Sequence, residues 1–298
     1  MTERKPLDAL AISLMLMLCL LWGLQQVAVK VAAPFMDPIL QIGLRSAIAA
    51  ILVLLLMLVR KERVATGKGM LRAGIAAGVF FAIEFLCVAV GLHYTSASHM
   101  SVFLYTAPIF IVLGLHLFVP GERLGPLQWG GVAAAFAGIV VAFSSGFSTG
   151  ARDWTLVLLG DVLGLAGGFF WAATTVLIRR SALSEAPPAT TLLYQLGTCG
   201  VVLIAIALIT GKAEVTLAPI LLGSLFLQSV LIAFISFLIW FWMLRRYLAS
   251  RLSVFSFLTP LFGVAFGVLL LNDPLESRFA IGAVLVMIGV VLVNLRRS

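Results

Sequence analysis

A single acidic residue lies deep inside an apolar run, and its side chain is well suited to chemistry. Glu84 stands about midway along the apolar segment from Leu71 to Leu92. An ionisable side chain in such surroundings is costly unless it is paired or protonated, so it indicates a functional site by default. Two roles fit this residue. It is either a carboxylate that binds a proton or the ammonium group of a substrate, or a structural carboxyl held by a neighbouring helix.

The other polar residues inside apolar runs are mostly uncharged, and their amide and hydroxyl groups suit a neutral or zwitterionic ligand. Tryptophan and tyrosine in the same runs supply flat apolar walls, although these residues also gather where helices leave a membrane. Trp22, Thr174, Gln195 and Ser236 belong to the wider set of candidates. We expect the substrate to contact Gln25, Gln26, Glu84, Ser101, Tyr105, Trp171, Thr175, Gln228, Ser229 and Trp240.

Four further charged residues lie within apolar runs or near their ends. For Arg45 we favour a structural role, such as donating hydrogen bonds to carbonyls at a helix end, over binding a substrate carboxylate. Lys30 and Arg179 lie near the ends of their runs, where a long side chain can extend to the membrane surface. Asp161 is a candidate ion-pair partner for either Arg45 or Lys30.

Three motifs of known enzyme classes are missing from the chain. It contains no HExxH pair, no two intramembrane aspartates suited to an acid-base dyad, and no phosphate-binding Walker loop. The three cysteines fall inside apolar runs and have neither disulfide nor metal-ligand spacing. We therefore expect a protein that is not an enzyme and that carries no cofactor and no metal.

The composition places these residues in a membrane protein. Of the 298 residues, 62% are hydrophobic and only 11% are charged, and the mean hydropathy is +1.16. A soluble domain carries roughly a quarter charged residues. A membrane-spanning helix needs about 20 mostly apolar residues. The chain supplies ten such segments, namely Leu10–Val31, Pro38–Val59, Leu71–Leu92, Ala97–Val119, Leu127–Phe143, Thr155–Ile178, Ala189–Ile209, Leu217–Leu244, Ala249–Leu271 and Arg278–Asn294.

The basic residues give the predicted spans an orientation. Lysine and arginine accumulate in the short loops on the cytoplasmic side of a membrane. With the N-terminus inside, fifteen of the 20 Lys and Arg residues fall in inner segments, and only Arg152, Lys212 and Arg278 fall in outer ones. This placement assigns the net charge of +8 to a cytoplasmic membrane face and argues against nucleic acid as a partner. We expect both termini to be cytoplasmic.

A short string of residues occurs twice. Ser101–Pro108 reads SVFLYTAP, and 152 positions later Ser253–Pro260 reads SVFSFLTP. Five spans per copy is an odd number, so the second copy must enter the membrane from the opposite side. We therefore predict two inverted five-helix repeats, residues 1–148 and residues 149–298, around a central cavity.

The repeated string places one proline inside each of two spans. Because proline lacks a backbone N–H, it removes a helical hydrogen bond and leaves the carbonyl four residues earlier without its usual partner. These carbonyls belong to Leu104 and Ser256. We predict bends at Pro108 and Pro260 that border the cavity and act as hinges.

Several motifs resemble a known family. Residues Trp22 to Lys30 read WGLQQVAVK, Arg45 precedes small residues, and Gly121-Glu122 follows the fourth span. In these features both halves of the chain resemble the EamA-type transporters of the drug/metabolite transporter superfamily. Overall the chain is most similar to the YddG branch of bacterial aromatic amino-acid exporters. The second half departs from the pattern, with Asp273-Pro274 in place of Gly-Glu and with Ala172 after its tryptophan.

The resemblance implies a ten-helix protein of the bacterial inner membrane that exports amino acids, aromatic or other neutral ones, and related metabolites by alternating access. The alternatives are an exporter of another metabolite or drug, and an integral-membrane enzyme. The expected partners are a small-molecule substrate and the lipid bilayer. Small residues at four-residue spacing, such as Gly130, Ala134 and Gly138, predict close helix packing within one molecule. We expect a monomer, with a dimer along such a seam as the alternative.

Overall fold

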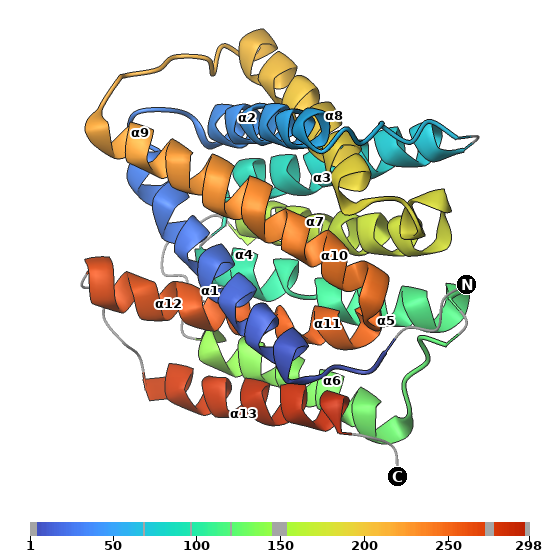
Figure 1. Ribbon diagram of the computed structural model, residues 1–298. Coiled ribbons are helices and arrows are strands. Elements are labelled where there is room, and N and C mark those ends of the chain that lie inside the picture. The colour runs from blue at the N-terminus through green and yellow to red at the C-terminus, as the bar shows by residue number, and fades with distance from the viewer. Residues whose placement is uncertain are drawn as a thin grey trace.

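The apolar runs of the sequence form helices in the computed structural model (Figure 1), which describes residues 5–67, 69–95, 97–119, 121–144, 154–271 and 277–295. Within these ranges there is no β-sheet, and only two isolated backbone bridges occur. The elements are α1 (Ala9–Ala32), α2 (Pro38–Val59), α3 (Met70–Gly91), α4 (Ala97–Leu104), α5 (Ala107–Phe118), α6 (Pro126–Ala142), α7 (Trp154–Arg180), η2 (Ala182–Ser184), α8 (Pro188–Ile209), α9 (Pro219–Phe226), η3 (Leu227–Ser236), α10 (Phe237–Arg246), α11 (Ala249–Phe255), α12 (Leu258–Leu271) and α13 (Ser277–Asn294).

The predicted ten-span membrane architecture is confirmed. Eight helical segments are long and apolar enough to cross a membrane, and two shorter apolar helices, α6 and α13, complete the set. The predicted boundaries of the spans differ from those of the helical segments by at most two residues. The fourth span consists of α4 and α5, the eighth of α9, η3 and α10, and the ninth of α11 and α12.

Local sequence signals fix where several helices begin. The carboxylate of Asp8 accepts a hydrogen bond from the Ala11 N–H at 2.9 Å, and that of Asp37 accepts one from the Ile39 N–H at 2.8 Å. These contacts satisfy first-turn donors that have no partner within the helix. Proline occupies the first turn of α2, α6, α8 and α9, where its missing N–H costs no hydrogen bond.

The spans run in alternating directions because short segments connect them. We call the end of the bundle at which α1 begins the N-terminal face and the opposite end the far face. In Figure 1 the helices run across the page, and the far face, with α9 and the end of α12, is at the left. Helix α13 ends at the N-terminal face, as an even number of spans requires.

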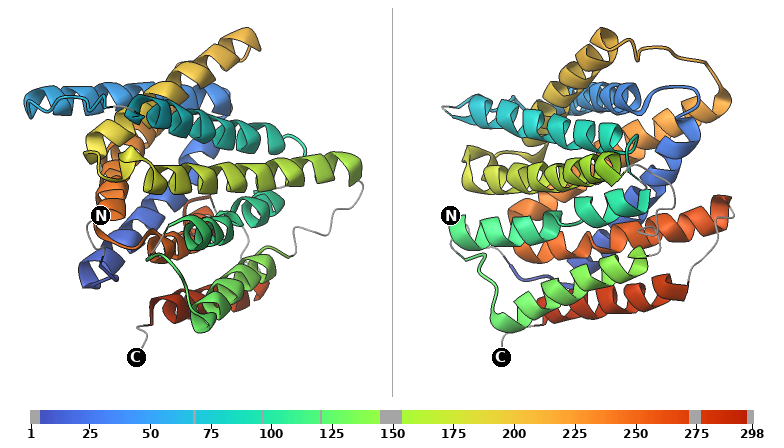
Figure 2. Two further views of the ribbon diagram at one scale, coloured as in Figure 1. Left: turned by 90° about the vertical axis from the view of Figure 1, so that its right-hand side faces the viewer. Right: turned by 180° about the vertical axis from the view of Figure 1, so that it is seen from behind.

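Helices α6 and α13 form a pair at one edge of the bundle, as both figures show (Figure 2). An added Cβ atom at Gly138 would lie 2.6 Å from the carbonyl oxygen of Gly282, so only glycine allows this approach. A Cβ atom added at Gly131 would lie 2.8 Å from the carbonyl oxygen of Gly289. The predicted seam is therefore intramolecular at Gly138. The prediction of close packing was wrong at Gly130, because the described structure has open space next to that residue.

The two spans that contain Pro108 and Pro260 are each broken into two helices, in agreement with the predicted bends. Helix α4 ends at Leu104 and α5 begins at Ala107, while α11 ends at Phe255 and α12 begins at Leu258. A hydroxyl group crosses each break: Thr106 Oγ1 donates to the carbonyl of Phe103, and Ser256 Oγ donates to that of Ser253, both at 2.6 Å.

One detail of the predicted bends was wrong. The carbonyl of Ser256 is not left without a partner, because it accepts a hydrogen bond from the Thr259 N–H at 3.0 Å. This shorter-range bond replaces the one that Pro260 cannot make. Pro108 and Pro260 are themselves buried.

The middle of the eighth span is a π-helix, which the sequence did not predict. Residues Leu227–Ser236 form η3 between the two α-helical ends of the span. Gln228 in this segment donates from Nε2 to Gln41 Oε1 at 3.1 Å and to Ser224 Oγ at 2.9 Å. The amide group thus ties the wide turn of η3 to α2, and this explains why a polar side chain lies there.

Candidate functional site

A cavity of about 160 Å³ lies between the spans, and helices from both halves of the chain line it. From the first half come residues of α1, α2, α3, α4 and the break after α4. From the second half come residues of α7, α8, α10 and α12. A cavity shared in this way is the usual position of a transporter's substrate site.

Aromatic side chains form much of the cavity wall. Trp22 meets Trp240 edge to face, with 5.6 Å between the ring centres, and Tyr105 meets Trp171 at 5.7 Å. The indole N–H of Trp22 donates to Ser236 Oγ at 3.0 Å, so that ring is held in place by a hydrogen bond as well as by packing. The aromatic lining consists of Trp22, Phe81, Phe85, Tyr105, Trp171, Phe237, Trp240 and Phe241.

The polar lining is sparse and contains one charged residue among the described side chains, Glu84. Its side chain is 7% exposed, and Oε2 is buried without a hydrogen-bond partner. Gln195 also faces the cavity with a buried Oε1 that has no hydrogen-bond partner. The polar lining residues are Gln25, Glu84, Tyr105, Thr174, Thr175, Gln195 and Thr259.

Arg45 lies close to this site but does not line the cavity. It is 0% exposed, and its guanidinium carbon lies 4.6 Å from the centre of the Phe85 ring. The prediction that Arg45 donates hydrogen bonds to helix-end carbonyls was wrong, because none of its three side-chain nitrogens has a hydrogen-bond partner in the described structure. A stacked aromatic face and the neighbouring charge of Glu84 take the place of those bonds.

The ten predicted contact residues separate into three groups. The side chains of Ser101, Gln228 and Ser229 do not line the cavity, and Ser229 is buried with no partner for its hydroxyl. The side chain of Gln26 lies outside the described part of the structure. The cavity brings together the remaining six, Gln25, Glu84, Tyr105, Trp171, Thr175 and Trp240.

Sequence reasoning missed five of the aromatic and polar lining residues, which are Phe81, Phe85, Phe237, Phe241 and Thr259. Helical periodicity would have found three of them. Phe81 and Phe85 lie within one turn of Glu84 on α3, and Phe237 lies three residues before Trp240 on α10. Thr259 adjoins Pro260, so its position beside a predicted bend was the available signal.

The cavity is elongated from one face towards the other. Val29, Pro38 and Leu92 line it at the far-face ends of α1, α2 and α3, and Leu92 is 44% exposed. At the other end, Ile178 of α7 and Leu244 of α10 line it close to the N-terminal face. The cavity therefore reaches the far-face ends of three helices.

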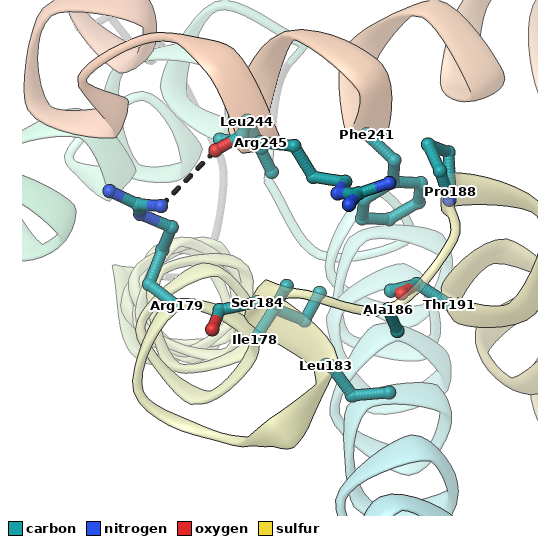
Figure 3. Close-up of a pocket in the computed structure, with 10 residues that line it drawn as sticks. All are labelled: Ile178, Arg179, Leu183, Ser184, Ala186, Pro188, Thr191, Phe241, Leu244 and Arg245. Atoms are coloured by element: carbon teal, nitrogen blue, oxygen red, sulfur yellow. Dashed lines mark hydrogen bonds between the residues drawn. The ribbon is translucent and has the colours of Figure 1, made fainter. Parts of the chain in front are cut away.

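A second, much smaller pocket adjoins the end of the cavity that lies near the N-terminal face (Figure 3). Three residues, Ile178, Phe241 and Leu244, line both this pocket and the central cavity. In Figure 3, side chains from α10 lie opposite those of α7 and η2. The three shared apolar residues, all buried, therefore form a partition between the central cavity and the small pocket near the N-terminal face.

A buried polar cluster reinforces this partition, and we call it the N-face latch; it comprises Glu122, Arg179, Ala249, Ser250 and the Leu244 carbonyl. Arg179 forms an ion pair with Glu122 and donates to the Leu244 carbonyl at 3.1 Å. Glu122 also accepts hydrogen bonds from the Ala249 N–H at 3.0 Å, the Ser250 N–H at 3.1 Å and Ser250 Oγ at 2.8 Å. The latch joins α7, α10, α11 and the segment before α6.

One prediction about a charged side chain needs correction. Arg179 does not extend to the membrane surface, because its side chain is 2% exposed and belongs to the N-face latch. Asp161 accepts a hydrogen bond from Thr95 Oγ1 at 2.7 Å. The expected ion pair of Asp161 with Arg45 or Lys30 stays a prediction.

At the N-terminal face the start of the chain is attached to the end of the eighth span. The Lys5 N–H donates to the Arg246 carbonyl at 3.0 Å, and the Tyr247 hydroxyl donates to the Asp8 carboxylate at 3.0 Å. The hydrogen bond from the Ala11 N–H, followed by the one from Tyr247, holds the pKa of Asp8 below its ordinary value of 3.8. Burial and the adjacent Asp8 carboxylate raise the pKa of Tyr247.

Known proteins are similar to this chain in fold or in sequence. A solved crystal structure superposes with a TM-score of 0.80 at 20% identity, covering 95% of this chain and 96% of that one. An uncharacterized transporter of Archaeoglobus fulgidus is 32% identical over 222 residues, which are 74% of this chain and 73% of the relative.

Two further relatives carry names that state a function. A probable amino-acid metabolite efflux pump of Escherichia coli is 26% identical over 284 residues, covering 93% of this chain and 92% of the relative. Its namesake in Salmonella typhimurium is 28% identical over 287 residues, with the same coverages. The model of the EamA-like transporter family matches the chain twice, over residues 9–144 and 158–295. With both halves matched and a cavity shared between them, the chain belongs to the EamA-like transporter family.

Proposed function

We propose that the protein is a secondary transporter that exports aromatic or other neutral amino acids and related metabolites from the bacterial cytoplasm by alternating access. The observation that carries the proposal is the central cavity, which reaches the far face and is partitioned from the N-terminal face. A carrier needs one site that is open to one side at a time. The names of the Escherichia coli and Salmonella relatives support an amino-acid substrate.

The aromatic walls support an aromatic substrate and placement in the YddG branch. Trp22, Tyr105, Trp171 and Trp240 present ring faces and edges to a space of about 160 Å³. Aromatic rings prefer edge-to-face and offset contacts, each worth about 0.5–1.5 kcal/mol beyond burial. A ligand with its own ring can make several such contacts at once.

The proposed orientation places the N-terminal face and both chain ends in the cytoplasm. Its support is the positive charge of that face, to which the basic residues of Arg60–Arg72, Arg179–Arg180 and Arg245–Arg251 contribute. In this orientation the N-face latch closes the cytoplasmic entrance, and the cavity faces outwards.

The proposed cycle uses the two halves of the chain, residues 1–148 and 149–298, as inverted repeats. Breaks at equivalent places, before Pro108 and before Pro260, give each half a short inner and a short outer segment. Tyr105 and Thr259 at these breaks line the cavity. We propose that the breaks are hinges that re-orient these segments when the N-face latch opens.

Counterflow in proteoliposomes tests the transport function. Vesicles that contain only this protein are loaded with unlabelled phenylalanine and diluted into a trace of labelled phenylalanine, with glucose and uracil as comparison solutes. We expect transient accumulation of label with phenylalanine, tyrosine or tryptophan. Absence of counterflow with every amino acid would overturn the proposal, whereas accumulation of uracil or glucose instead would reassign the substrate.

A matched pair of variants ties transport to the cavity. Trp240 is 8% exposed and lines the cavity, whereas Trp154 is 65% exposed on the outer surface of α7. We expect Trp240→Ala to weaken the apparent affinity for phenylalanine about tenfold or more, because it removes a buried aromatic wall. Trp154→Ala should leave it unchanged. Equal effects of the two variants would refute a substrate site in this cavity.

A further inference from the structure

Several polar groups that face the cavity are hydrogen-bond acceptors, beside the amide N–H groups of Gln25 and Gln195 and the hydroxyls of Tyr105 and Thr259. Glu84 contributes a carboxylate and Gln195 contributes an amide oxygen, and both have a buried oxygen without a partner. The hydroxyls of Thr174 and Thr175 donate to backbone carbonyls of their own helix at 2.9 and 3.2 Å. Their hydrogens are therefore engaged, and their oxygens are left as acceptors. A ligand group rich in N–H donors matches such a wall.

The acidic group of the wall favours a cationic group, and the buried guanidinium of Arg45 behind the wall offsets part of its charge. Glu84 is the only charged residue among the described side chains that line the cavity. A primary ammonium group brings one positive charge and three N–H donors. It can satisfy the unpartnered Oε2 of Glu84 with a charge-assisted hydrogen bond, which is about twice as strong as a neutral one.

A carboxylate finds no equivalent partner in the described lining. Arg45 is 0% exposed and is absent from the cavity wall. Its guanidinium carbon is 4.6 Å from the centre of the Phe85 ring, and Phe85 itself lines the cavity. A carboxylate in the cavity would thus depend on neutral donors such as the amides of Gln25 and Gln195.

Aromatic rings surround the acidic group. Phe81 and Phe85 flank Glu84 on α3 with ring centres 4.8 Å apart, and Phe81 meets Phe237 of α10 at 5.9 Å. Ring faces attract ammonium groups, with estimates of about 0.5–2 kcal/mol per contact according to exposure. The same rings accept the apolar body of a ligand. The surroundings of Glu84 therefore suit an amine that is attached to an apolar or aromatic group.

We infer that Glu84 binds the ammonium group of the substrate and that the substrate's carboxylate is dispensable, so the cavity takes aromatic primary amines as well as aromatic amino acids. This inference rests on the proposed transport function and identifies the chemical group that the same cavity recognises.

Three ligands with one ring and different polar groups test the inference: phenylalanine, 2-phenylethylamine and 3-phenylpropanoate. Their affinities are measured on the purified full chain by tryptophan fluorescence, which can report binding because Trp22, Trp171 and Trp240 line the cavity. We expect 2-phenylethylamine to bind within a few fold of phenylalanine, and 3-phenylpropanoate to bind at least about tenfold more weakly than the amine. Glu84→Gln should weaken both amine ligands about tenfold or more and leave the acid unaffected.

Controls separate this inference from the proposed function. Glu84→Asp retains the charge and should retain the preference for the amine, while Glu62→Gln changes an exposed glutamate at the N-terminal face and should change nothing. If Glu84→Gln does not fold, the affinities of the three ligands for the unaltered chain still test the inference. Binding of the acid as tightly as the amine, or of phenylalanine without the amine, would overturn the inference while leaving amino-acid transport intact. Failure of all three ligands to bind would overturn the inference and an aromatic substrate, while counterflow with the other amino acids would still decide the proposed function.

Discussion

Removing one charge from the N-face latch should open the N-terminal face, and Glu122→Gln is the smallest change that does so. Glu122 is 1% exposed, and both of its carboxylate oxygens are engaged. Oε1 accepts from Arg179 and from the Ala249 N–H, while Oε2 accepts from the N–H and the hydroxyl of Ser250. Glutamine has nearly the same shape but carries no charge, and its NH₂ group must face two donors.

The size of the effect follows from these contacts. Arg179 is 3% exposed and loses its ionic partner Glu122, although it keeps the Leu244 carbonyl. Breaking a buried ion pair by removing one partner costs roughly 3–5 kcal/mol. When the N-terminal face opens, water reaches Arg179, so this cost applies to the closed state alone. At about 1.4 kcal/mol per factor of ten, the ratio of closed to open molecules should fall roughly a hundredfold or more.

Labelling of a cysteine in the partition measures this ratio. Cys19, Cys87 and Cys199 are replaced by alanine, and Leu244→Cys is introduced, because Leu244 is 3% exposed and lines both cavities. A membrane-impermeant maleimide is then added to vesicles of each orientation. We expect Glu122→Gln to raise the labelling rate from the N-terminal face by up to the factor estimated above, and to lower the rate from the far face.

The control for this experiment is Glu62→Gln, which removes an exposed carboxylate from the same face. Its labelling rates should equal those of the parent. The proposed role of the N-face latch is wrong if Glu122→Gln leaves both rates unchanged in a protein that still melts cooperatively. It is also wrong if the control has an equal effect, since any loss of negative charge at that face would then suffice.

Three further changes test other parts of the structure. Gly138→Val should lower the melting temperature, because a Cβ there would lie 2.6 Å from a facing carbonyl and overpacking costs about 1–3 kcal/mol; Gly130→Val, beside open space, should cost little. Pro108→Ala should slow counterflow while the melting temperature is kept or raised, since alanine restores the missing N–H at the break before α5. Because the folded-state pKa of Asp8 is lowered, its hydrogen bonds stabilise the fold above pH 3.8 and are lost as the pH falls through the folded value. Asp8→Asn should therefore lower the melting temperature near neutrality, with a difference that shrinks below that pH.

The spans and part of the site could be predicted because hydrocarbon penalises polar atoms so strongly. Within an apolar run, Glu84 and Gln25 are conspicuous, and both line the cavity. The same penalty is relieved when a polar group bonds to a neighbouring helix, and sequence does not distinguish the two outcomes. Gln228 stood out equally, yet its amide joins η3 to Gln41 of α2. The predicted cavity position of Gln228 failed for this reason.

Other features depend on side chains that meet only in the folded protein. Arg179 lies near the end of a span, where reaching for the membrane surface is the usual behaviour of a long cationic side chain. Its burial requires Glu122, which is 57 positions earlier in the chain, and backbone donors from Ala249 and Ser250 to satisfy that carboxylate. Sequence spacing within one helix carries no information about such a meeting point. The prediction of which glycines of α6 face α13 was wrong at Gly130 for a similar reason. Gly130 and Gly131 are the same residue type, and only the fold decides which of them faces α13.

The central cavity and the N-face latch are linked through two helices. On α7, Thr175 lines the cavity, and Arg179, one turn later, belongs to the latch. On α10, Trp240 lines the cavity, and the Leu244 carbonyl, also one turn later, accepts from Arg179. Residues four positions apart lie on the same side of a helix, so a ligand that draws α7 and α10 together acts on the same contacts that close the N-terminal face. A shift of either helix by a fraction of a turn changes both the cavity wall and the contacts of the N-face latch. Binding of a ligand therefore acts on the latch directly, with no separate structural element between them.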